Sequence, residues 1–527
     1  MDERQPSEVR RGLLQRQSTR RALLAGTATI AAAGAAAAVI GISQQGAGGG
    51  SGGNSPGKNT RTPGAGSSPT ASPTVDLKRP IEDAKRRAAH LLRRAGFGGT
   101  LAQIEEFSKL SRDDAADRLI NYESVDNSAL DEIITKANFN LFAGRQADIT
   151  RWWMTRMVYT ARPLEERMTL IWHGLLTSQI SKIGLTMTKL MWMQNELYRK
   201  NALPKYDDLI KAVSRDGAML IYLDNNVSTN RHPNENYSRE LMELFTLGVG
   251  NYTEEDVRES ARAFTGWRIL PRATGDTDLV TYNPQFTLVA RDHDNGEKTF
   301  LGQTGNFGGD DMIDIIMKQP AAGRFITTRL FTEFANFNPE PATIDRLVGV
   351  WDSSGHDIKA IVRAILVSDE FYSEASYRGF VRSPVEFMVG AYRGLELMPT
   401  AQGIRPVADK LVQGMGQVLF EPPNVAGWPS GSGWLSSGTF FARVNFLDQF
   451  LFTGVGRNAQ PPALPGLANA SAAEDLVASA LSILVDNNVP DATRQSITDY
   501  ARTIPDPGDR AAAVAYLVLA SPEYQLT

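Results

Sequence analysis

The chain has 527 residues, of which 22% are charged and 42% hydrophobic, and its formal net charge is −4. This balance is typical of a globular protein, and without a strong basic field we expect no nucleic-acid partner. The sequence contains no cysteine, which excludes disulfides, thiolate metal sites, a cysteine nucleophile and lipid attachment through an N-terminal cysteine.

Residues 1–45 have the pattern of an export signal. Arg20 and Arg21 stand directly before Ala22–Ile42, a run without charge that is rich in alanine. Paired arginines before a mildly apolar run are typical of a twin-arginine signal, so we expect a protein exported to the cell envelope or secreted. The run is long enough to span a bilayer, so cleavage and retention as a membrane anchor both stay open, and membrane contact is expected only if this segment is retained.

Residues 46–76 consist mostly of Gly, Ser, Thr, Pro and Ala, which predicts a flexible linker because such residues bury little apolar surface. The body is expected over residues 77–527, as one unit or as two subdomains. A weak internal echo bears on this alternative, because IVRAILVSDEF (361–371) and VAYLVLASPEY (514–524) both end in Ser-x-Glu-aromatic. Two related subdomains and chance both explain the echo.

Helix signals dominate the body. Several segments start with a capping residue, a capping box or a first-turn proline, and most continue with apolar residues at helical spacing. The predicted helices begin near Ile81, Thr100, Ser111, Pro163, Asn234, Thr253 and Ser383.

One segment favours β structure. Phe286–Asp294 and Glu297–Leu301 flank Asn295-Gly296, a favoured two-residue hairpin turn. The predicted fold class is therefore mainly α: a multi-helix globular body with a small β-hairpin insertion near residues 268–310.

Six segments together resemble a known bacterial family, catalogued as domain of unknown function 1800. They are RRAAHLLRRAGFGGT (86–100), ERMTLIWHGLLTS (166–178), RHPNENYSRELMELFTLGVGNYTEEDVRESARAFTGW (231–267), HDNGEKTFLG (293–302), RSPVEFMVGAYR (382–393) and MGQVLFEPPNVAGWPSGSGWL (415–435). The resemblance spans about residues 80–527. It implies a commonly exported protein, often encoded beside a sulfatase-like partner, and it brings no catalytic residues.

The densest polar segment is the predicted helix from Asn234 to Gly248. On it Asn236, Glu240 and Glu243 lie at i, i+4 and i+7, which places three oxygen-bearing side chains on one stripe. Such a stripe suits a divalent cation or an acid–base pair. The alternative is a structural network with Arg258 and Arg262 of the following helix.

Histidines suggest a second site. His90, His173 and His293, the last followed by Asp294, come from separate segments and could join Glu240 around a divalent metal. His173 and His293 are also candidates for acid–base catalysis. The sequence has no HExxH motif, and a histidine beside a tryptophan, as at Trp172-His173, is more often a packing residue.

The loop FEPPNVAGWP (420–429), followed by Trp434, suggests a third site. Trp428 and Trp434 could offer flat apolar faces to a sugar ring, and Asn424 could bond its hydroxyls. The alternative, which we favour, is that Trp428 packs inward and anchors an irregular loop.

Two functions follow as hypotheses. The first is surface binding or assembly together with a sulfatase-like partner. The second is a metal-assisted hydrolase of an envelope or extracellular polymer. Convergence of His90, His173, His293, Glu240 and Glu243 in one cleft would favour the enzyme, and their dispersal the binding protein.

Overall fold

The computed structural model describes residues 76–142, 145–184, 187–269, 284–401, 403–404, 412–453, 462–468, 470 and 472–527. The predicted signal, nearly all of the predicted linker and residues 270–283 of the predicted β insertion lie outside this part of the chain. The described residues are mainly helical, as predicted. No helix among them is long and apolar enough to cross a membrane.

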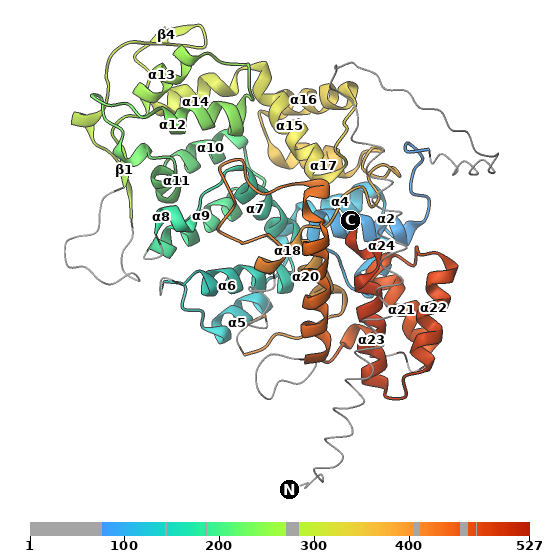
Figure 1. Ribbon diagram of the computed structural model, residues 1–527. Helices are drawn as coiled ribbons and strands as arrows, with labels where there is room; N and C mark the ends of the chain where they lie inside the picture. Colours follow the sequence, from blue (N-terminus) through green and yellow to red (C-terminus); the bar gives the residue numbers. More distant parts are fainter. Residues whose placement is uncertain are drawn as a thin grey trace, which may run out of the picture.

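The N-terminal half of the body is a succession of short helices. They are α2 (Ala84–Gly96), α3 (Leu101–Phe107), α4 (Arg112–Ile120), α5 (Ser128–Ala137), α6 (Gln146–Tyr159), α7 (Pro163–Leu175), α8 (Ile180–Ile183), α9 (Thr188–Lys200), α10 (Tyr206–Ser214), α11 (Gly217–Tyr222), α12 (Glu235–Glu240), the π-helical segment η4 (Leu241–Thr246) and α13 (Glu254–Ala263). Helix α7 is central to this group, because it contacts α2, α4, α6 and α9 (Figure 1).

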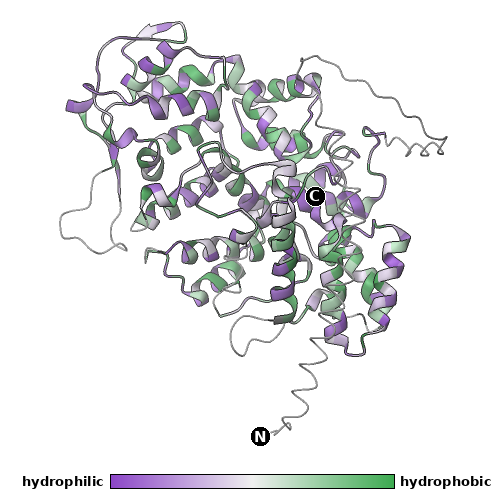
Figure 2. Cartoon of the chain, in the orientation of Figure 1, coloured by the Kyte–Doolittle hydropathy of each residue, from purple (hydrophilic) through white to green (hydrophobic). Residues whose placement is uncertain are grey.

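The second half completes the helical body. Its helices are α14 (Gly309–Met317), α15 (Pro320–Phe334), α16 (Pro341–Ser354), α17 (Ile358–Leu366), α18 (Pro384–Gly394), α20 (Ser437–Asp448), α21 (Ala473–Val485), α22 (Asp491–Arg502), α23 (Pro507–Ala520) and α24 (Pro522–Gln525). Figure 2 shows apolar residues on the inward faces of many helices, as amphipathic packing requires. Trp153, Trp172 and Trp351 are among the largest fully buried side chains.

The predicted helix starts are confirmed where local capping decides them. Thr253 and Ser383 form capping boxes with Asp256 and Glu386. Ser111 accepts a bond from the Asp114 amide, but the Asp114 carboxylate bonds the serine hydroxyl instead of a backbone amide. The first helix begins after the Asp83 cap, slightly later than predicted.

The predicted β-hairpin insertion is confirmed, but the predicted hairpin turn at Asn295-Gly296 is wrong. Strand β1 (Trp267–Ile269) pairs antiparallel with β2 (Phe286–Leu288), and β3 (Lys298–Phe300) with β4 (Gln303–Gly305). The tight turn of the second pair is Leu301-Gly302, where both φ angles are positive. At Asn295-Gly296 the Asp294 carboxylate accepts a hydrogen bond from the Gly296 amide (2.8 Å). It also accepts one from the Arg262 guanidinium of α13 (2.8 Å).

The two echo segments have matching local structure. In each, a serine hydroxyl accepts a bond from the backbone amide of the aromatic residue three positions later: Ser368 from Phe371, and Ser521 from Tyr524. The carbonyl of the next residue then accepts a bond from an amide just before a helix: Tyr372 from Ile81 before α2, and Gln525 from Arg382 before α18, both at 2.8 Å. The match supports two related subdomains, which stays a prediction.

Candidate functional site

The loop of residues 415–435 is fixed onto the C-terminal end of α7. The His173 Nε2 accepts a bond from the Phe420 amide (3.2 Å), and the Thr177 hydroxyl donates to the Val425 carbonyl (2.6 Å). Gly427 has a φ of 89°, and any side chain there would clash with the Gly174 carbonyl oxygen. Two segments far apart in the sequence therefore form one unit.

The tryptophans of this loop serve as anchors. Trp428 is half-buried, with its ring edge-on to His173 at 5.2 Å between centroids. Trp434 is buried, and its carbonyl oxygen accepts bonds from Thr439 and Arg443. Of the three predicted binding residues only Asn424 is exposed, and its side-chain oxygen accepts the Ala426 amide. This packing agrees with the alternative in which Trp428 packs inward and anchors the loop.

The same loop reaches a polar cluster on the neighbouring helices. We call it the Tyr222 cluster, and define it as Lys182, Tyr222, Asp224, Asn236, Glu240 and Glu421. The Asp224 carboxylate accepts hydrogen bonds from the Lys182 ammonium (2.9 Å) and from the side-chain amide of Asn236 (3.4 Å). Tyr222 is buried, which raises the pKa of its hydroxyl, and the charges of Glu421 and Glu240 raise it further.

Glu240 is the unusual member of this cluster. It is half-buried, and it has no hydrogen-bond or ion-pair partner in the part of the chain that the structure describes. Burial raises the pKa of its carboxyl, and the charge of Glu243 raises it further, while Arg239 opposes both. A carboxyl placed in this way can hold a proton more easily than an ordinary glutamate.

The predicted network of Glu240 and Glu243 with Arg258 and Arg262 is wrong. Arg258 pairs with Glu255, and Arg262 pairs with Glu259 and Asp294. Arg239 pairs with Glu235 and Glu254. All three arginines therefore pair with acids other than Glu240 and Glu243. Glu243 accepts a hydrogen bond from the Tyr252 hydroxyl (2.6 Å).

We therefore expect Glu240→Gln to leave the free energy of unfolding within about 0.5 kcal/mol of the wild-type value. The substitution removes a half-buried charge that forms no ion pair among the residues the structure describes. Glu243→Gln is the matched control, and its weakened bond to Tyr252 should cost about 0.5–1.5 kcal/mol. Urea unfolding of both variants measures the difference. A loss of more than about 2 kcal/mol in Glu240→Gln would reveal a partner at that carboxylate.

The family described as "Protein of unknown function (DUF1800)" matches residues 90–526. The chain belongs to the DUF1800 family. No curated protein and no solved structure shows a significant match.

In this DUF1800 protein the predicted histidine site does not assemble. The His90 Nε2 contacts the Phe371 carbonyl (3.0 Å), and the His293 Nδ1 contacts the Thr265 carbonyl (2.8 Å). His173 lies among aromatic rings, where burial lowers its pKa to about 3. Among the described residues no three His, Asp or Glu side chains gather as metal ligands. Asp294 adjoins His293 in the sequence, but its carboxylate pairs with Arg262 (2.8 Å).

Sequence reasoning missed a groove on the same DUF1800 body. Its volume is about 1060 Å³, and irregular segments form most of its walls. We call it the Phe337 groove, and its lining includes residues 336–340, 373–375, 377–379 and 430–432. Phe337 is 39% exposed and lies beside Phe380, with 4.3 Å between ring centroids. The only sequence signal was the polar, proline-ended run Asn336–Pro339.

The acids of the groove are held in place by neighbouring groups. Glu370 accepts the Thr343 hydroxyl (2.8 Å) and pairs with Arg346, and Glu374 pairs with Arg79 (3.0 Å). Gly431, from the loop of residues 415–435, lies against the Phe337 ring. The groove thus combines an exposed aromatic ring with pre-positioned polar groups.

Proposed function

We propose that the protein is an exported cell-envelope or extracellular binding protein that works with a sulfatase-like partner, and that the Phe337 groove receives a segment of that partner. The groove supports this proposal by its size. Small-molecule pockets usually measure about 300–1000 Å³, and this groove is at or above the upper end of that range. Its dimensions suit an extended chain or a protein segment better than a small substrate.

The chemistry of the groove also suits a protein partner. Exposed aromatic side chains in partly enclosed sites supply much of the binding energy of protein interfaces. Phe337 has Gly431 on one side and Phe380 on another, so little conformational entropy remains to be lost on binding. Export rests on the pattern of residues 1–45 and stays part of the proposal.

We expect Phe337→Ala in the full chain to weaken binding of the sulfatase-like partner by about 30-fold, the effect of losing ~2 kcal/mol at an interface hot spot. Isothermal titration calorimetry with the purified partner measures this. The matched control is Phe441→Ala, because Phe441 is 66% exposed on α20 and does not line the groove. The proposal would be contradicted if Phe337→Ala bound the partner with wild-type affinity, or if the wild-type chain did not bind the partner.

The hydrolase alternative has one observation in its favour. Glu240 has a raised pKa and lies in the Tyr222 cluster, which suits a general acid. Release of fragments from an envelope polymer by the purified full chain, abolished in Glu240→Gln, would favour this alternative.

A further inference from the structure

The described part of the body begins at the Phe337 groove. Leu77 and Lys78 line this groove, so the predicted linker joins the body at the groove wall. Residues 46–75 stay attached there whether the predicted signal is cleaved or retained. The C-terminal end of the linker is therefore a permanent neighbour of the groove.

The first described residues lie along the groove wall as an extended strand. The Ala375 amide donates to the Leu77 carbonyl (3.0 Å). The Ile81 amide donates to the Tyr372 carbonyl (2.8 Å). Because this pairing is antiparallel, each earlier residue of the strand lies beside a later residue of the wall. Continued toward the N-terminus, the same direction leads along residues 377–379, which also line the groove.

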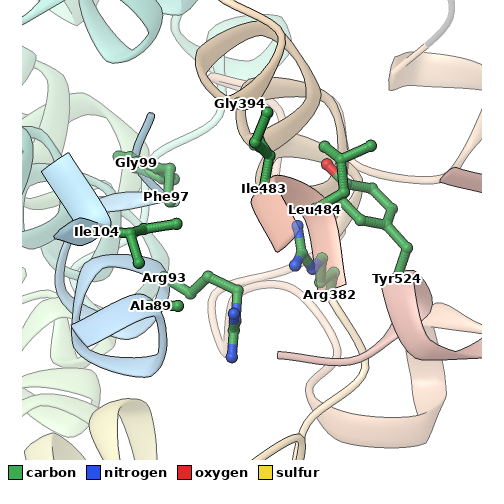
Figure 3. A pocket seen from close by; sticks show the side chains of 12 residues that line it. Ala89, Arg93, Phe97, Gly99, Ile104, Arg382, Gly394, Ile483, Leu484 and Tyr524 are labelled. Atoms are coloured by element: carbon green, nitrogen blue, oxygen red, sulfur yellow. The ribbon is translucent and has the colours of Figure 1, made fainter. Parts of the chain in front are cut away.

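The groove is large enough to receive a chain segment. Its volume is about 1060 Å³. By contrast, the cavity that lies between α2 and α3 on one side and α18, α21 and α24 on the other measures about 10 Å³, which is room for one water-sized sphere (Figure 3). Of these two spaces, only the groove can receive a segment of polypeptide.

The charged side chains that line the groove already have partners. The ion pairs are Lys78–Glu340, Arg79–Glu374, Arg112–Asp369 and Arg346–Glu370. Arg378 donates to the Val485 and Asn488 carbonyls. A charged occupant would have to displace one member of a pair, whereas an uncharged segment leaves all of them in place. The groove therefore favours an uncharged occupant.

The end of the linker has this chemistry. Residues 62–75 (TPGAGSSPTASPTV) contain three prolines and no charged side chain. Proline favours the extended polyproline II conformation, and such segments dock in aromatic grooves at a low cost in conformational entropy. Phe337 is 39% exposed and Leu77 48% exposed, so both offer apolar surface to proline rings and to Val75.

We propose that residues 62–75 dock in the Phe337 groove of their own chain, and that a segment of the sulfatase-like partner displaces them; the displacement rests on the proposed function. A tethered segment has an effective concentration of about 1 mM. With an intrinsic Kd of about 1 mM it fills about half of the grooves and lowers the affinity of the partner about twofold. The linker thus covers the exposed Phe337 ring without excluding a tightly binding partner.

Introduced cysteines test the contact in the full chain, which has no cysteine of its own. We expect the disulfide in Ser72→Cys/Ser432→Cys to form about 10-fold faster than that in Ser72→Cys/Ser437→Cys. Ser432 lines the groove, whereas Ser437, also exposed, begins α20 and does not line it. Each rate is divided by that of the same Ser432→Cys or Ser437→Cys thiol with a small disulfide, because a helix N-terminus lowers a thiol pKa.

Adding Phe337→Ala to the Ser72→Cys/Ser432→Cys chain should remove most of the difference between the two rates. Mass spectrometry of the monomer under non-reducing conditions measures the rates. Equal corrected rates for the two cysteine pairs, or an unchanged rate after Phe337→Ala, would overturn the linker contact.

Purified partner distinguishes the linker contact from its displacement. We expect saturating partner to slow disulfide formation in Ser72→Cys/Ser432→Cys to the rate of the control pair. A partner that binds this chain without slowing the reaction would overturn the displacement. If the partner does not bind the wild-type chain, the proposed function and the displacement both fail, while the two disulfide rates still decide the linker contact.

Discussion

Replacing Glu166 by alanine should lower the free energy of unfolding by about 3–5 kcal/mol, the largest effect expected of any single substitution considered for this chain. Glu166 is fully buried on α7. It accepts two bonds from Arg199 (2.8 and 3.0 Å), one from Arg156 (2.8 Å) and one from the Trp153 indole (3.0 Å). Alanine would remove the anion that Arg156 and Arg199 share. Arg199 would keep Glu196 (2.8 Å), but Arg156 would lose its carboxylate partner, and a buried unpaired charge costs far more than the bond it replaces.

The neighbouring Glu165 is a matched control within the same helix turn. The arginines lower the pKa of Glu166 to about 2, against the opposing effect of burial, whereas burial and the charge of Glu166 raise the pKa of Glu165. Glu165→Ala should therefore change stability little or increase it slightly. Urea unfolding at neutral pH measures both variants, and equal losses would show that the Glu166 network does not stabilise the fold.

The pH dependence of the Glu166 contribution has a definite sign. The pKa of this carboxyl in the folded state lies below its ordinary value of 4.5. Its stabilisation is therefore fully present above that ordinary value and is lost as the pH falls toward about 2.

The features that could be predicted from the sequence are those decided by neighbours along the chain. Ser383 with Glu386, and Thr253 with Asp256, form capping boxes within one helix turn. Their spacing in the sequence is therefore enough to predict these helix starts. The predicted hairpin turn at Asn295-Gly296 was wrong because Arg262, which is distant in the sequence, pairs with Asp294 and fixes this turn. Turn propensity alone contains no information about that contact.

The predicted network of Glu240 and Glu243 with Arg258 and Arg262 was wrong for the same reason. The spacing of Arg258 and Arg262 places them on one face of α13 but does not choose among the acids they can reach, and both pair with a glutamate on their own helix. Arg93 and Arg94 look like flanking charges in the sequence, yet they are 6% and 1% exposed. They are buried because Arg94 donates to the Phe334 carbonyl and Arg93 donates to Asp486, and both acceptors are distant in the sequence.

Asp216→Asn should stabilise the protein at neutral pH, although it removes a charged helix cap. Asp216 accepts the Met219 amide at the start of α11 (3.0 Å) and the Gln194 amide (2.7 Å). It is buried and pairs with no cation among the residues that the structure describes, and burial raises its pKa from 3.8 to about 6. Keeping this carboxylate ionised in the fold at pH 8 therefore costs about 3 kcal/mol.

The sign of the effect follows from proton binding. Between pH 3.8 and about 6 the folded chain holds a proton that the unfolded chain has released, so wild-type stability falls as the pH rises through this window. Asparagine cannot ionise, still accepts the Met219 amide, and can donate to the Gln194 Oε1, which lacks a partner. The expected gain is about 3 kcal/mol at pH 8 and about 1 kcal/mol at pH 4.5. Urea unfolding at both values measures it, with Asp506→Asn at the exposed cap of α23 as the control. An equal gain at both pH values, or a loss at pH 8, would show that the Asp216 carboxyl is not strained by burial, because only a titrating group gives a gain that grows across this window.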